Sequence, residues 1–137
     1  MSAVHDNIIK SYFVDMRNGI LRVDTEYCGG SNGKENTVVT FEGVFTHLFA
    51  DVLEKDNNII FDITEGLICD FLADNRELLK NRKNYGWPCV YENEPKLLDL
   101  LNSKKLRYFK MESSYGLFGW ILAEDMKITT NGVTKRL

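Results

Sequence analysis

Four side chains of this sequence could do acid–base chemistry if the fold brought them into one pocket. They are His47, Asp62, Glu112 and Tyr115. An imidazole titrates near neutral pH, and two carboxyl groups in one pocket can divide the roles of proton donor and acceptor. However, no Ser, Cys or Asp forms a recognisable nucleophile motif with His47. The sequence therefore predicts no catalytic residue, and these four are candidate pocket residues only.

One segment resembles a phosphate-binding loop without completing it. A P-loop has the pattern GxxxxGK[ST], in which backbone amides hold the phosphates and a hydroxyl reaches Mg²⁺. In residues 28–35, Cys28 replaces the first glycine and Glu35 replaces the hydroxyl residue. Since a carboxylate there repels phosphate, we expect an ordinary flexible loop between two strands.

The cysteines and the apolar runs indicate in which cellular compartment we expect the protein. Cys28, Cys69 and Cys89 are an odd set without CxxC spacing, which argues against a disulfide framework and a zinc site. The first residues have neither the basic nor the apolar region of a secretory signal. No apolar run approaches the roughly 18 residues needed to span a bilayer. We therefore expect a cytoplasmic protein with free thiols, no metal, no cofactor and no membrane partner.

Composition is that of a globular chain, and its charge is uneven. The 137 residues are 44% hydrophobic and 27% charged, which predicts a single domain over residues 1–137. Residues 1–63 carry five Lys/Arg and ten Asp/Glu, a net −5, whereas residues 64–137 carry twelve and ten, a net +2. Nucleic acid requires a concentrated basic surface, so we expect no nucleic-acid partner.

The first half of the chain predicts strands. Residues 8–27 read as a hairpin with a two-residue turn at Asn18-Gly19. This register places Val14 opposite Val23, and Asp15 opposite Arg22. A third strand is expected from Thr37 through Thr46 or beyond, with Gly43 as a bulge. Residues 59–63 are expected to return antiparallel to it.

The strongest helical pattern runs from about Glu65 to Asn84, with Thr64 as the N-cap. Its apolar stripe, placed by 100° per residue, faces the sheet. One flank of the stripe is acidic and the other is basic. The acidic edge consists of Asp70, Asp74 and Glu77; the basic edge consists of Arg76, Lys80 and Lys83. The acidic edge is a candidate contact for a basic protein surface.

Aromatic residues and a second helix follow. Trp87 and Tyr91 lie after the expected end of the long helix and are candidate interface anchors. A shorter helix is predicted from Glu94-Pro95. A hairpin then turns at residues 114–116, and both faces of its second strand are apolar, which predicts a covered strand. A short strand at residues 126–130 follows, and we expect a frayed tail after it.

These elements predict an α+β fold. We expect a mainly antiparallel sheet or partly open barrel of six to seven strands, with two helices inserted between the fourth and fifth strands. The choice between an open sheet and a closed barrel depends on a shear that the pattern does not define.

Two aromatic-glycine motifs, Tyr-Gly-Trp-Pro at residues 85–88 and Ser-Ser-Tyr-Gly-Leu-Phe-Gly-Trp at residues 113–120, together with this layout, resemble those of small uncharacterised bacterial cytoplasmic proteins. Some proteins of that class are immunity proteins. The resemblance implies a non-catalytic protein-binding domain whose acidic or aromatic patch blocks the active site of a cognate toxin. The alternative is a small-molecule-binding or enzymatic α+β barrel, with a pocket beneath the helices lined by the four candidates above.

Overall fold

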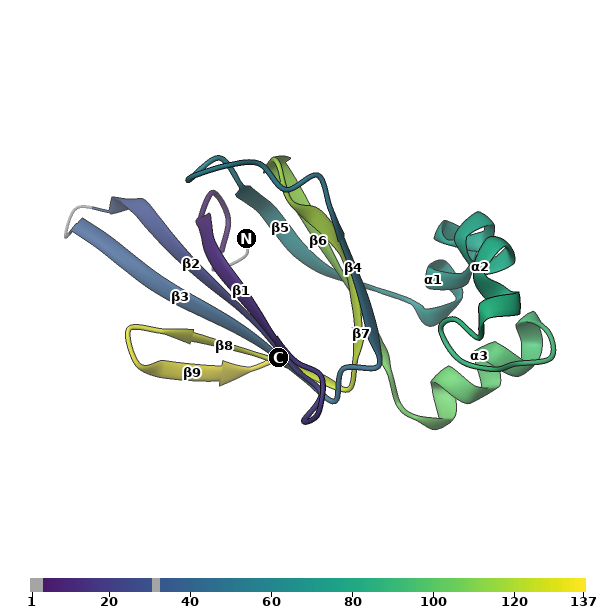
Figure 1. Cartoon of the computed structure of the whole chain (residues 1–137). Coiled ribbons are helices and arrows are strands. Elements are labelled where there is room, and N and C mark those ends of the chain that lie inside the picture. The colour runs from purple at the N-terminus through teal and green to yellow at the C-terminus, as the bar shows by residue number, and fades with distance from the viewer. Residues whose placement is uncertain (1–3, 31–32) are drawn as a thin grey trace.

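The computed structural model describes residues 4–30 and 33–137 (Figure 1). Within them, nine strands form one antiparallel sheet in the order β4-β7-β6-β5-β1-β2-β3-β8-β9. The strands are β1 (Ile8–Asp15), β2 (Ile20–Gly30), β3 (Gly33–Glu42), β4 (Thr46–Ala50), β5 (Ile59–Gly66), β6 (Arg107–Tyr115), β7 (Phe118–Ala123), β8 (Asp125–Thr130) and β9 (Val133–Arg136). The helices between β5 and β6 are α1 (Ile68–Asp74), α2 (Arg76–Arg82), the short 3-10 helix η1 (Lys83–Tyr85) and α3 (Glu94–Ser103).

The sheet curls back on itself because two chain segments bend at a common corner. β3 and β4 belong to one segment that bends at Gly43, where φ is +62°. β7 and β8 are separated only by Glu124, whose backbone N–H donates to the carbonyl oxygens of Glu42 and Gly43 at 3.0 and 3.2 Å. β4 pairs with β7, and β3 pairs with β8. The β4–β7 pair and the β3–β8 pair therefore meet at this corner.

The curled sheet encloses the larger apolar core, which we call the inner cluster. Alternate residues of each strand face it, as the two-residue period of a strand requires. Phe41 of β3 and Phe109 of β6 are both fully buried there, with their ring centroids 5.3 Å apart. The inner cluster thus joins strands that do not pair with each other.

The helices cover part of the outer face of the sheet, beside β6 and β7 (Figure 1). Phe71 of α1 lies edge-on to Tyr108 and Trp120, with ring centroids 5.4 and 4.9 Å apart. We call this second core the helix-side cluster. Trp120 belongs to it, whereas the next residue, Ile121, belongs to the inner cluster. The prediction that the β7 strand has two covered apolar faces is therefore confirmed here.

The predicted strand number and the predicted place of the helices are wrong. We expected six to seven strands, with two helices between the fourth and fifth; the described chain has nine strands and three α-helices, all between β5 and β6. The strand expected from Thr37 divides at Gly43 into β3 and β4, because the positive φ turns the chain at the corner. β5 was expected to pair with the strand before it, but pairs with β1 and β6.

The long helix from Glu65 to Asn84 is also wrong in its extent. β5 continues through Gly66 because it pairs with β6 that far, so Thr64 is a strand residue and not an N-cap. The helix is then broken at Asn75, which has φ −116° and ψ 22°. The Asn75 side chain donates to the carbonyl oxygen of Phe71 at 3.0 Å, and such local bonds compete with helix continuation. Two helices of seven residues each result.

The first hairpin is confirmed, but its predicted register is wrong by two residues. Asp15 pairs with Ile20, so the turn contains four residues and not two. The Asp15 carboxylate accepts hydrogen bonds from the backbone N–H groups of Arg17 and Asn18, both at 3.1 Å, which stabilises the longer turn. Arg22 consequently lies opposite Phe13 and not opposite Asp15.

The tail that we expected to fray forms β9. Asn131 and Gly132 have φ of +50° and +84°, and Thr130 pairs with Val133 across them. This is the two-residue turn with two positive φ angles that Asn-Gly favours. The prediction for residues 28–35 was a loop. β2 instead extends to Gly30 and β3 begins at Gly33, while residues 31 and 32 lie outside the described residues.

Candidate functional site

The four candidate pocket residues lie at three places on the sheet. Asp62 of β5 and Glu112 of β6 are direct cross-strand neighbours. Glu112 accepts a hydrogen bond from the Thr64 hydroxyl at 3.5 Å, and the Asp62 carboxylate accepts one from the N–H of Ile63. His47 lies on β4, which does not pair with either strand. Only the two carboxylates are brought together, and Glu112 is exposed.

His47 lies on the inner side of β4, beside Phe49. The two rings are 5.5 Å apart between centroids, and Phe49 packs against the inner cluster. Burial lowers the pKa of the His47 imidazole below its ordinary value of 6.5. The neutral ring therefore predominates at neutral pH. Its contact in the described chain is the apolar ring of Phe49 and not a carboxylate.

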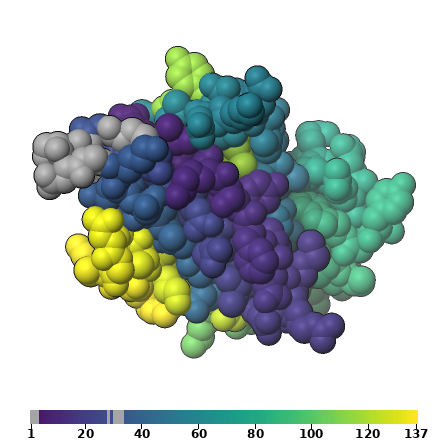
Figure 2. Space-filling model, turned by 60° about the vertical axis from the view of Figure 1, so that its left-hand side comes forward, coloured from purple at the N-terminus to yellow at the C-terminus, as the bar shows by residue number. Residues whose placement is uncertain are grey.

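Glu112 and Tyr115 line two adjoining hollows on the outer face of the sheet. The hollow beside Tyr115 has a volume of about 640 Å³, and the hollow beside Glu112 about 510 Å³. Both are lined by Ser113 and Phe118, so the two hollows lie side by side. Figure 2 shows the light-green tip of the β6–β7 hairpin beside the teal segment between β4 and β5, at the top of the molecule.

We call this feature the outer-face groove and define it by its large apolar residues. They are Leu48, Val52, Leu53, Tyr115 and Phe118. Each of them is between 39% and 65% exposed. They come from three parts of the chain: β4, the segment after it, and the β6–β7 hairpin. Our sequence predictions named only Tyr115 of these five.

The length of the helices explains why this surface is open. A continuous helix of 20 residues would extend about 30 Å, enough to cover the outer face along the whole length of a strand. The break at Asn75 leaves α1 only seven residues long, or about 10 Å. The helix-side cluster therefore covers Trp120 and leaves Phe118, two residues earlier on the same face, 45% exposed. The signal that could have revealed the groove in the sequence is an apolar strand residue, Phe118, that the helices do not reach.

The members of the acidic edge have different surroundings. Asp70 accepts a hydrogen bond from the backbone N–H of Leu67 at 3.1 Å and so caps α1. Asp74 accepts a hydrogen bond from the Tyr108 hydroxyl at 3.0 Å. Glu77 lies in the first turn of α2, on the other side of the break. Two of the three carboxylates thus have structural partners, and the three do not share one helix.

The aromatic candidates pack against the helix-side cluster. The Trp87 and Trp120 ring centroids are 6.1 Å apart. Lys83 places its ammonium 5.1 Å from the centroid of the Tyr91 ring, and burial raises the pKa of the Tyr91 phenol. Both Trp87 and Tyr91 are half-buried. Their contacts account for them as packing residues of the helical layer.

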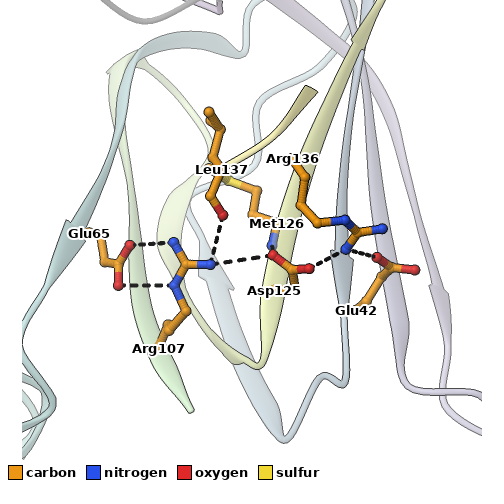
Figure 3. Close-up of polar contacts among 7 residues, drawn as sticks. All are labelled: Glu42, Glu65, Arg107, Asp125, Met126, Arg136 and Leu137. Carbon is orange, nitrogen blue, oxygen red and sulfur yellow. Dashed lines mark hydrogen bonds and ion pairs between the residues drawn. The ribbon is translucent and has the colours of Figure 1, made fainter. Parts of the chain in front are cut away.

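A set of charged side chains joins five strands of the sheet (Figure 3). Arg107 donates two hydrogen bonds to Glu65, at 2.7 and 3.0 Å, and lies 3.3 Å from Asp125. Arg136 pairs with both Asp125 and Glu42. We call these five residues the arginine network. It links β5 and β6 to β3, β8 and β9.

The charges of the arginine network cancel when its neighbour Lys127, 3.6 Å from Glu42, is included. Three carboxylates then face three cations. The cations lower the pKa of Glu42 and Asp125. Because each charged group has an opposite charge as its partner, the network acts as a structural clasp and presents no free acid or base.

We next consider residues that could bind a metal ion or react as thiols in the described chain. Residues 4–30 and 33–137 contain no group of three or more His, Cys, Asp or Glu side chains placed to hold a metal ion. Cys69 and Cys89 are free thiols, the first exposed and the second half-buried, with burial raising the pKa of Cys89. The side chain of Cys28 lies outside the described part.

Comparisons with known proteins give no match: no protein-family model, no curated protein and no solved structure matches the chain. The resemblance to small bacterial proteins therefore stays an expectation. In the described part of the chain, the helices are too short and too polar for any of them to cross a membrane.

Proposed function

We propose that this chain is a non-catalytic protein-binding domain whose contact surface is the outer-face groove. The observation that carries the proposal is the groove itself: five large apolar side chains, each at least 39% exposed, line two adjoining hollows. Contiguous exposed apolar surface of this kind marks interaction sites in soluble proteins. Aromatic anchors such as Tyr115 and Phe118 are favoured at the centre of interfaces.

The charges that line the groove define the partner. Asp51, Asp74 and Glu112 line it, against a single cation, Lys110. An apolar surface with an acidic rim is complementary to an apolar anchor flanked by Lys or Arg. We therefore propose a basic protein as the partner. A toxin neutralised by this chain is one such partner, and that finer proposal requires that the captured protein be an enzyme and lose activity when bound.

Affinity capture with matched baits tests the proposal. The test bait carries Val52→Ser and Phe118→Ser, which remove two apolar side chains of the groove. The control bait carries Val90→Ser and Tyr85→Ser, which remove the same kinds of side chain at positions 89% and 88% exposed outside the groove. Melting temperatures establish that both baits fold.

We expect the wild-type and control baits to retain one basic protein in equal amount, and the groove variant to lose it. Capture by all three baits in equal amount would contradict the groove as the contact surface. Loss from the control bait alone would assign the contact to the helical layer instead.

A further inference from the structure

The basic edge stays together in the structure, whereas the break at Asn75 divides the acidic edge. Arg76, Lys80 and Lys83 all follow the break, in α2 and η1, at spacings of four and three residues that place them on one face. All three line a single pocket of about 230 Å³ between α2 and the start of α3 (Figure 1). We call it the inter-helix pocket. Among the described residues, it shares no lining side chain with the outer-face groove.

The inter-helix pocket has an apolar floor. Leu79 of α2 and Leu97 of α3 line it, and they are only 5% and 0% exposed. The half-buried side chain of Tyr91 lines it as well. Ligand sites commonly combine such an apolar lining with a few polar groups that fix the orientation of the ligand. The floor therefore favours a ligand with an apolar part.

The polar lining of the pocket is positive. Glu94 supplies a carboxylate, which is already paired with Arg76 at 3.1 Å. The ammonium group of Lys83 lies 5.1 Å from the centroid of the Tyr91 ring and has no carboxylate partner in the part of the chain that the structure describes. The side chain of Lys80 has neither an ion pair nor a hydrogen bond among the described residues. Two ammonium groups are thus left to bind an anion.

Asn93 adds an uncharged donor to the lining. Its side-chain oxygen accepts a hydrogen bond from the backbone N–H of Lys96 at 3.0 Å and so caps α3. The cap uses only the oxygen, which leaves two N–H donors on the amide nitrogen. The pocket therefore offers several donors to a ligand, while the carboxylate of Glu94 is occupied by Arg76.

We propose that the inter-helix pocket binds a small phosphate monoester with an aromatic body, an aryl phosphate. A phosphate monoester carries about two negative charges at neutral pH and three acceptor oxygens, which match the two free ammonium groups and the amide of Asn93. A carboxylate would neutralise only one of the two ammonium groups. The ring of the ligand covers Leu79 and Leu97 and packs beside the ring of Tyr91. This ligand site is independent of the proposed protein contact.

Titration of the full chain with phenyl phosphate tests the proposal, with the backbone amide signals followed by NMR. Inorganic phosphate and benzoate are the comparison ligands, because the first lacks the ring and the second has a single charge. Burial of a ring strengthens binding by about tenfold or more, and so does a further charge-assisted hydrogen bond. We therefore expect phenyl phosphate to bind about tenfold or more tightly than either, and to shift the amide signals of Leu79, Tyr91 and Leu97.

Two pairs of substitutions locate the anion. Lys80→Gln with Lys83→Gln removes both free ammonium groups of the pocket. Arg82→Gln with Lys96→Gln is the matched control, because it changes the net charge equally at exposed positions of α2 and α3 outside the pocket. Melting temperatures establish that both variants fold. We expect the pocket pair to weaken the binding of phenyl phosphate about tenfold or more, and the control pair to change it by less than about twofold because solvent and salt screen exposed charges.

The inference is overturned if phenyl phosphate fails to bind, or binds no more tightly than inorganic phosphate or benzoate. Signal shifts confined to residues outside the pocket would place the anion elsewhere and would also reject it. Equal weakening by the pocket pair and the control pair would indicate a general attraction to positive charge without a site. None of these results alters the expected capture of a basic protein by the outer-face groove, so the two proposals are tested separately.

Discussion

At the scale of single residues, Asp74 illustrates how a surface role and a structural role are confused in a sequence. Its position in a row of acidic residues indicated a contact surface, and it does line the outer-face groove, but its carboxylate also accepts a hydrogen bond from Tyr108, which is only 2% exposed. This bond ties the end of α1 to β6. The spacing of carboxylates along a helix does not reveal the partner that a strand places beneath them.

A double-mutant cycle on Asp74 and Tyr108 measures how much their hydrogen bond contributes to the free energy of unfolding. Asp74→Ala removes the acceptor from a buried hydroxyl, and we expect a loss of about 1 kcal/mol of the free energy of unfolding. Tyr108→Phe removes the donor of the bond, so Asp74→Ala should cost less in that background. Urea unfolding provides the free energies. Strictly additive losses in the double mutant would show that the hydrogen bond between the two side chains does not contribute to stability.

At the scale of elements, the sequence predicts the second helix and the presence of the first and the β6–β7 hairpins, but not the register of the first hairpin, the β8–β9 hairpin or the break in the long helix. Asn-Gly pairs do not all make the same turn: the pair at residue 131 makes the two-residue turn, and the pair at residue 18 lies in a four-residue turn closed by Asp15. α3 begins at Glu94 as expected, because Asn93 caps it. The break at Asn75 comes with a local bond from its side chain to the carbonyl oxygen of Phe71, which the apolar periodicity of the segment does not report.

The contact between β4 and β7 depends on one glycine. A Cβ atom on Gly119 would lie 1.9 Å from the carbonyl oxygen of Leu48, so the two backbones approach too closely for any side chain. We expect Gly119→Ala to lower the free energy of unfolding by about 2 kcal/mol or more, as overpacking does. It should also speed amide exchange in β4.

Gly29→Ala is the matched control for this substitution. Its Cβ meets only the hydroxyl end of the Tyr27 side chain, which can move away, so the expected change is within about 0.5 kcal/mol. Equal effects of the two substitutions, measured by urea unfolding, would contradict the close approach of β4 to β7.

At the scale of the whole molecule, the curled sheet is held by the corner at Gly43 and by the arginine network, which joins strands distant in the sequence. The sequence predicted antiparallel strands around an apolar core, but not their closure. Closure depends on residues such as Glu65 and Arg136, which are 71 positions apart in the chain (136 − 65) and meet only through Arg107 and Asp125. Such pairs of surface charges are indistinguishable from solvated ones in a single sequence.

The network predicts a loss of stability in acid. The pKa values of Glu42 and Asp125 lie below their ordinary 4.5 and 3.8 because Arg136 donates to both carboxylates. Their contribution is therefore complete above the ordinary values and is lost as pH falls through the lowered ones. We expect the urea midpoint to fall steeply below about pH 4 and Arg136→Gln to flatten that fall. An unchanged slope in the variant would show that the network does not hold the fold.

The most direct measurement of the central claim is the amide-exchange footprint of the captured basic partner on this chain. The groove predicts slowed exchange in β4, in the segment after it and at the tip of the β6–β7 hairpin, with α2 unchanged. Slowed exchange confined to the helices that carry Asp70 and Glu77, with β4 unchanged, would contradict the claim and place the contact on the helical layer.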